Sequence, residues 1–94
     1  MNKYEVLYII NNEVADEKKN DIVTRFSTLV EANGGNVITV DKWGTRKYAY
    51  PIDYKTEGYY VLMTFEAKGE FIAELERLMR NNESIVRELV TLAQ

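Results

Sequence analysis

Residues 59–65 read Tyr59-Tyr60-Val61-Leu62-Met63-Thr64-Phe65, a run rich in aromatic and β-branched side chains. Such a composition is typical of a β-strand. Alternate side chains of a strand point to opposite faces of its sheet. Four large apolar side chains therefore share one face: Tyr59, Val61, Met63 and Phe65. The pattern predicts a strand with this face buried.

The segment before this strand predicts its hairpin partner. An unusually long extended stretch runs from Asn36 to Tyr50, and Gly44 within it indicates a bulge or bend. Pro51 is expected to end the strand, because it cannot donate a ladder hydrogen bond. Residues 53–58 are expected to form the connection.

The segment after the central strand predicts a helix and then a final strand. Four apolar residues keep helical spacing: Phe71, Leu75, Leu78 and Met79. Acidic residues near the start and Arg77 and Arg80 near the end complement the helix dipole. The helix is expected to end at Asn81-Asn82. Residues 85–92 then read as a strand whose two faces are both partly apolar, so the sequence leaves its facing open.

The N-terminal third repeats the order of strand and helix. Residues 4–10, YEVLYII, have the composition of a strand. Apolar residues at helical spacing follow, after charged first turns: Ile22, Phe26, Leu29 and Val30. Asn33-Gly34-Gly35 should end this helix, since Gly tolerates the left-handed conformation common at helix C-termini.

The predicted order is strand, helix, strand, strand, helix, strand. It is typical of an α+β, ferredoxin-like βαββαβ split sandwich, a four-stranded antiparallel sheet with two helices on one face. Right-handed crossovers place the first and third strands in the middle. Six residues then fall on the open face: Glu5, Leu7, Ile9, Tyr60, Leu62 and Thr64. Four of these are apolar, so we expect a protein or a nucleic acid to cover this face.

Composition limits the possible functions. The chain has 94 residues, 46% hydrophobic and 29% charged, which fits one soluble domain spanning residues 1–94. It contains no Cys and no His, so thiol nucleophiles, a histidine base and the commoner zinc or haem sites are absent. Together with the lack of a phosphate-binding glycine motif, this predicts a protein that is not an enzyme and has no cofactor or metal. No apolar run is long enough for a membrane span or signal peptide, and we expect a cytoplasmic location.

Charge and aromatic residues are concentrated in one segment. Residues 42–55 carry four cations against one anion, a local charge of +3, which leaves −6 for the rest because the whole chain is −3. The same segment holds four of the eleven aromatic residues. An acidic protein binds nucleic acid poorly by itself, so this basic segment is the expected place of contact.

An RNA-recognition motif has the same order of elements and stacks bases on its open sheet. Residues 7–11 resemble its short first-strand motif, but residues 57–64 lack its second motif: Glu57 stands at a basic position and Thr64 at an aromatic one. The two interpretations place Tyr8 oppositely. We predict that Tyr8 is buried under the helices, whereas an RNA-recognition motif would expose it.

Residues 43–52, WGTRKYAYPI, carry the most specific signal. They closely resemble the signature of the family of bacterial small-subunit ribosomal protein number six: aromatic or Leu, Gly, any residue, Arg, Arg or Lys, apolar, Ala, Tyr, Pro, Ile. Tyr4-Glu5-Val6 and Gly58-Tyr59-Tyr60 also fall at family-like spacing. The resemblance covers nearly the whole chain.

This resemblance implies a ferredoxin-like structural protein that pairs with a small basic ribosomal protein, the eighteenth of the small subunit. Together they bind the central domain of small-subunit rRNA. The candidate rRNA-binding residues are Lys3, Tyr4, Arg46, Lys47 and Arg87. The candidate partner-binding residues are Leu7, Ile9, Trp43, Tyr48, Tyr50, Tyr60 and Leu62.

Several of these assignments have structural alternatives. Arg46 could pack along its strand with a solvated head. The alternative for Tyr48 and Tyr50 is packing in the core. For Trp43 it is a purely structural packing role. The chain also ends at Gln94 without the charged tail of several family members, which favours few direct RNA contacts. The alternative function is a ferredoxin-like domain that regulates an enzyme by docking a small ligand or a second copy of itself across the open face.

Overall fold

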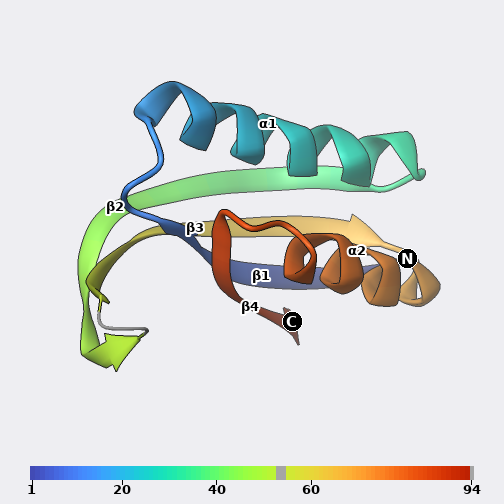
Figure 1. Ribbon diagram of the computed structural model, residues 1–94. Helices are drawn as coiled ribbons and strands as arrows, with labels where there is room; N and C mark the ends of the chain where they lie inside the picture. Colours follow the sequence, from blue (N-terminus) through green and yellow to red (C-terminus); the bar gives the residue numbers. More distant parts are fainter. Residues whose placement is uncertain (53–54, 94) are drawn as a thin grey trace.

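The computed structural model describes residues 1–52 and 55–93, with side chains described for residues 1–47 and 57–93. This part of the chain forms six elements in the order β1 (Asn2–Asn11), α1 (Asp16–Ala32), β2 (Asn36–Ile52), β3 (Lys55–Ala67), α2 (Gly69–Arg80) and β4 (Ile85–Leu92). The strands pair antiparallel in one sheet of order β2-β3-β1-β4 (Figure 1). The predicted ferredoxin-like arrangement, with β1 and β3 central, is confirmed.

The core lies between the sheet and both helices. Alternate residues of the two central strands are fully buried: Val6, Tyr8 and Ile10 of β1, and Val61, Met63 and Phe65 of β3. Residues of both helices join this cluster: Ile22, Val23, Phe26, Val30, Phe71, Leu75 and Met79. Both helices therefore cover the same face. The predicted burial of Tyr8 is confirmed, and the facing that an RNA-recognition motif requires is wrong for this chain.

The turn between α1 and β2 follows the prediction from the Asn-Gly-Gly sequence. Asn33 caps the helix, and its side-chain amide donates to the Leu29 carbonyl over 2.8 Å. Gly34 has a φ of +83°, the left-handed conformation that favours glycine. A Cβ on Gly35 would lie 2.6 Å from the Glu66 carbonyl oxygen. The second glycine therefore lets the end of α1 approach β3 closely.

The β2–β3 hairpin is longer than the sequence predicted. Arg46 pairs with Gly58, and Ile52 pairs with Lys55, so the expected connection at 53–58 is wrong for residues 55–58, which belong to β3. Pro51 lies inside β2 and not after it. The polar composition of 55–58 suggested a loop, but a β-ladder needs only backbone groups and continues through polar residues once a partner strand is present.

The distal part of this hairpin extends beyond the end of β1. The last residue of β1, Asn11, pairs with Gly58, so the hairpin beyond Gly58 has no neighbour in β1. Figure 1 shows this part curling away from α1. The basic segment of the sequence thus lies largely on an arm of the sheet.

Pairing with β1 settles the facing of β4, which the sequence left open. Leu89 pairs with Leu7, and Arg87 pairs with Ile9, so both lie on the open face. A register shift between Ile9 and Ile10 leaves Val86 as an extra residue in β4.

Candidate partner and nucleic-acid interface

Cross-strand pairing arranges the open face in rows. One row runs through Leu89, Leu7 and Leu62, from β4 across the two central strands. The neighbouring row runs through Arg87, Ile9 and Tyr60. Residues directly opposite each other have Cβ atoms about 5 Å apart, so each row is a continuous line of side chains. We call these six residues the central patch.

The patch is unevenly exposed. Leu89 is 61% exposed, whereas Ile9 is only 8% exposed although it lies on the open face. Leu7, Tyr60 and Leu62 are half-buried. Ile9 therefore supports its neighbours and offers little surface to a partner. Leu89, which the sequence did not single out, is the most accessible apolar side chain of the patch.

Trp43 contacts both Tyr60 and Arg46 beside the patch. The rings of Trp43 and Tyr60 are nearly parallel, at 8°, with their centroids 6.3 Å apart. The Arg46 guanidinium carbon lies 5.6 Å from the centre of the Trp43 ring, within the range of a cation–π contact. Trp43 Nε1 donates to an Asp41 carboxylate oxygen over 3.1 Å. This set is the aromatic stack.

A β-bulge brings the stack together. The register between β2 and β3 shifts between Lys42 and Gly44, and Gly44 has a φ of +82°. Trp43 and Gly44 therefore share Tyr60 as their partner on β3. The bulge thereby places the indole beside Tyr60 on the open face. The predicted bulge at Gly44 is confirmed.

Charge is polarised along the open face. Arg46 and Arg87 lie toward the hairpin arm. Glu5 and Glu66 lie at the opposite end, where Lys3 faces Glu66 across the β1–β3 ladder. The open face thus has a basic end and an acidic end with the central patch between them.

Two candidate RNA-binding residues point the other way. Tyr4 lies on the helix-covered face, where its ring stacks on Phe65 with centroids 5.8 Å apart. Lys47 pairs with Glu57, whose alternation also places it on that face. The structure does not bring either residue together with Arg46. The side chains of Tyr48 and Tyr50 lie outside the described residues.

Behind the stack, a polar cluster ties β2 to α1. Lys19 is 6% exposed, and its ammonium group donates to Asn12 Oδ1 over 3.2 Å and lies 5.0 Å from the Tyr59 ring centre. Thr45 Oγ1 donates to the same Asn12 oxygen over 2.9 Å. Lys42 also donates to Asn20 of α1 over 3.0 Å. These contacts were not predicted from the sequence, because a lysine in the first turns of a helix is normally solvated.

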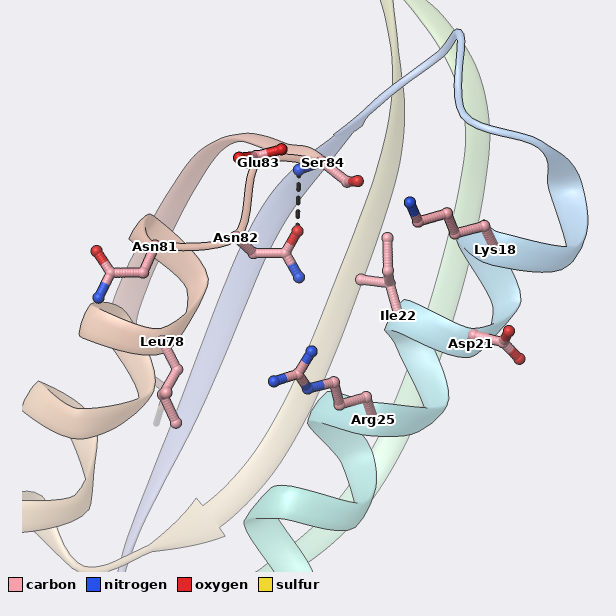
Figure 2. Close-up of a pocket in the computed structure, with 9 residues that line it drawn as sticks. All are labelled: Lys18, Asp21, Ile22, Arg25, Leu78, Asn81, Asn82, Glu83 and Ser84. Atoms are coloured by element: carbon pink, nitrogen blue, oxygen red, sulfur yellow. Dashed lines mark hydrogen bonds between the residues drawn. The ribbon is translucent and has the colours of Figure 1, made fainter.

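A groove of about 470 Å³ separates α1 from the turn between α2 and β4 (Figure 2). It is lined by Lys18, Asp21, Ile22, Arg25, Leu78, Asn81, Asn82, Glu83 and Ser84. Lys18 and Arg25 point toward it, and Asp21 points away (Figure 2). Only two of the nine lining residues, Ile22 and Leu78, are apolar. We place the candidate site on the open face, where apolar side chains form continuous rows.

The described residues hold no group of His, Cys, Asp or Glu that could bind a metal ion. Among them, no helix is long and apolar enough to cross a membrane. Burial raises the pKa of Tyr8 far above its ordinary value, and its hydroxyl has no hydrogen-bond partner. That hydroxyl lies in the core, away from the open face.

Comparison with known proteins gives one consistent result. A family model described as Ribosomal protein S6 matches residues 3–91. The small ribosomal subunit protein bS6 of Carboxydothermus hydrogenoformans is 44% identical over 90 residues, which cover 96% of this chain and 94% of that protein. The bS6 protein of Alkaliphilus metalliredigens is 42% identical over 94 residues, covering 100% of this chain and 99% of that one.

A solved structure agrees with the sequence matches. The crystal structure of 30S ribosomal protein S6 from Thermotoga maritima has a TM-score of 0.93 and 30% identity. The similarity covers 98% of this chain and 87% of that one.

Proposed function

The chain belongs to the ribosomal protein S6 family, and from this we propose that it is a structural component of the small ribosomal subunit, where it associates with rRNA. The family consists of ribosomal proteins and not of enzymes. The alternative of an enzyme-regulating domain therefore loses its basis. We further propose that residues 1–94 act as one domain, in the cytoplasm, without a cofactor or metal.

The finer proposal is that this chain binds the central domain of small-subunit rRNA together with a small basic ribosomal protein, the eighteenth of the small subunit. The observation that carries it is the row of Leu89, Leu7 and Leu62 on a sheet face that no helix covers. A protein of net charge −3 is repelled by phosphates unless a basic partner shares the surface.

The proposed partner surface is the central patch. Its apolar row supplies the desolvated centre of an interface, and the acidic end with Glu5 and Glu66 complements a basic protein. Tyr60 and Trp43 border this surface. Tyr48 and Tyr50 remain candidates on the hairpin arm.

The proposed RNA surface is the basic end of the open face. Arg46 and Arg87 are exposed there, and Lys3 is an exposed cation at the start of β1. The placement of Tyr4 and Lys47 on the opposite face does not support a role for them at this surface.

Leu89→Asp tests the proposal directly. Leu89 is exposed, so the substitution leaves the core intact, but it places a charge in the centre of the proposed interface. Affinity for the basic partner, measured by calorimetry, should fall on the order of tenfold or more.

Leu92→Asp is the matched control. Leu92 is 58% exposed on the same strand, but it pairs with Tyr4 and so lies on the other face. Its affinity should stay within about twofold of the original. Equal partner binding by Leu89→Asp and the unchanged chain would show that the partner does not use the patch.

A further inference from the structure

We infer that Trp43 is a positioning residue, which holds the Arg46 guanidinium against its indole by a cation–π contact so that Arg46 meets an rRNA phosphate in a preset orientation. This inference rests on the proposed function and assigns a different role to Trp43 from that of a partner anchor. Its basis is the contacts that Trp43 makes with Tyr60, Arg46 and Asp41, together with the N–H donors of Arg46 that remain unoccupied in the described part of the chain.

The indole is held on three sides. Tyr60 lies parallel to one face, Arg46 lies over the ring at 5.6 Å, and Asp41 accepts the Nε1 hydrogen. These contacts fix the position of the ring, although Trp43 is 39% exposed.

Arg46 is an exposed member of the stack. A guanidinium that lies over an aromatic ring keeps its N–H donors in the plane of its own fork, and that fork matches two oxygens of a phosphate. Among the residues whose side chains the structure describes, 1–47 and 57–93, Arg46 makes no ion pair or hydrogen bond that would occupy these donors. The side chain is thus both oriented and available.

The stack also explains the composition of the segment. A long exposed Arg normally loses many rotamers when it binds, and a fixed orientation reduces this loss. The bulge at Gly44 gives the indole its place over Tyr60, and the Asp41 carboxylate locks the ring. One short segment therefore contains the Arg46 cation, the Trp43 indole that supports it and the bulge at Gly44 that brings the two together.

The free chain provides the first test, which needs no RNA or partner. In NMR spectra, the side-chain protons of Arg46 should show upfield ring-current shifts that disappear in Trp43→Ala and persist in part in Trp43→Phe. Unshifted Arg46 protons in the unchanged chain would overturn the inference. Circular dichroism verifies that each variant folds.

The second test is a double-mutant cycle on the assembly of chain, basic partner and rRNA. Arg46→Ala should weaken assembly about tenfold or more, and Trp43→Ala roughly three- to tenfold. The double variant should be little weaker than Arg46→Ala alone, because the indole acts only through the guanidinium. Arg46→Lys should keep the salt dependence but lose most of the coupling to Trp43, since an ammonium has no planar fork.

Arg87→Ala is the matched control: this exposed arginine lies on the same face but not on the stack, so its effect should simply add to that of Trp43→Ala.

Three outcomes would overturn the inference. If Arg46→Ala weakens assembly and the effect of Trp43→Ala adds to it independently, the positioning role is wrong and the proposed RNA contact of Arg46 stands. If Arg46→Ala has no effect, both are wrong. If Trp43→Ala weakens binding of the partner protein in the absence of RNA, Trp43 is a partner anchor and the inference fails.

Discussion

The Tyr8 ring is completely buried in the core, where it packs edge-on against Phe26. Its hydroxyl finds no hydrogen-bond partner within the part of the chain that the structure describes. A buried, unsatisfied hydroxyl costs free energy, because it gives up its bonds to water.

Tyr8→Phe should therefore stabilise the protein. Removing the orphaned hydroxyl while keeping the ring should raise the free energy of unfolding by about 1–2 kcal/mol, as measured by urea denaturation at neutral pH. Tyr4→Phe is the control, since the Tyr4 hydroxyl is within 3.4 Å of the Asn2 amide and only half-buried. A destabilised Tyr8→Phe would mean that the hydroxyl has a partner in solution.

The same residue predicts a loss of stability at alkaline pH. Burial raises the pKa of Tyr8 in the folded state, whereas in the unfolded state it titrates near its ordinary value of about 10. Its contribution is therefore complete below pH 10 and is lost as pH rises above that value, by about 1.4 kcal/mol per pH unit. The stability advantage of Tyr8→Phe should grow by about 1 kcal/mol between pH 10 and pH 11, because half of the unfolded chains are already ionised at this tyrosine at pH 10. A constant difference in the unfolding free energies across this range would contradict the buried titration.

At the scale of elements, the bulges of β2 decide which side chains reach the open face. Alternation alone describes a regular strand, and each extra residue reverses the facing of everything after it. Gly44 indicated one bulge from sequence, but the register shift around Ile38 left no such signal. The sequence did not specify a face for Tyr4 or Lys47 either, because proximity along the chain to an RNA candidate does not determine which way a side chain points.

Gly44→Ala should separate the strain of the bulge from steric effects. A Cβ at Gly44 meets nothing within 4 Å, so the cost comes from its φ of +82° and should be roughly 1–2 kcal/mol in unfolding free energy. Gly34→Ala is a close control, since Gly34 has a φ of +83° and equally open surroundings. Both variants should be destabilised in urea, but only Gly44→Ala should change the Trp43 fluorescence of the folded state. Identical folded-state spectra would show that the bulge does not position the indole.

Asn12 links elements that the sequence did not connect. Its side-chain oxygen accepts from both Lys19 of α1 and Thr45 of β2. Asn12→Ala leaves the buried Lys19 ammonium without this acceptor and should lower the unfolding free energy by about 1–3 kcal/mol. Asn20→Ala removes only the exposed contact to Lys42, and it should cost less than about 0.5 kcal/mol in the same measurement. Equal effects of the two substitutions would argue against a structural role for the buried lysine.

At the scale of the whole molecule, the fold was predictable because every local signal agreed with it. Strand and helix periodicities, the Asn-Gly-Gly stop and the order of elements all indicated one architecture. The open face was predicted only in part. Its β1 and β3 residues followed from alternation, whereas Leu89 depended on pairing between β1 and β4, and the stack depended on a bulge that brings β2 side chains over β3.

The charge distribution limits how strongly this chain alone can bind RNA. Among the residues whose side chains the structure describes, the open face offers the cations Arg46, Arg87 and Lys3, while the whole chain is −3. Each phosphate contact contributes roughly 0.7–0.9 to the slope of log affinity against log salt concentration. Binding of this chain alone to rRNA should therefore be weak, with a slope no steeper than about −3.

Adding the basic partner should increase both affinity and slope, because the partner supplies the cations that this chain lacks. Filter binding across a salt series, with the chain alone, with the partner, and with Leu89→Asp plus partner, separates the contributions. Leu89→Asp should reduce the gain from the partner without changing the slope of the chain alone, since it removes no cation that contacts a phosphate. Tight and steeply salt-dependent binding by the isolated chain would place the RNA-binding charge outside the open face, because three cations there cannot release enough counterions to produce it.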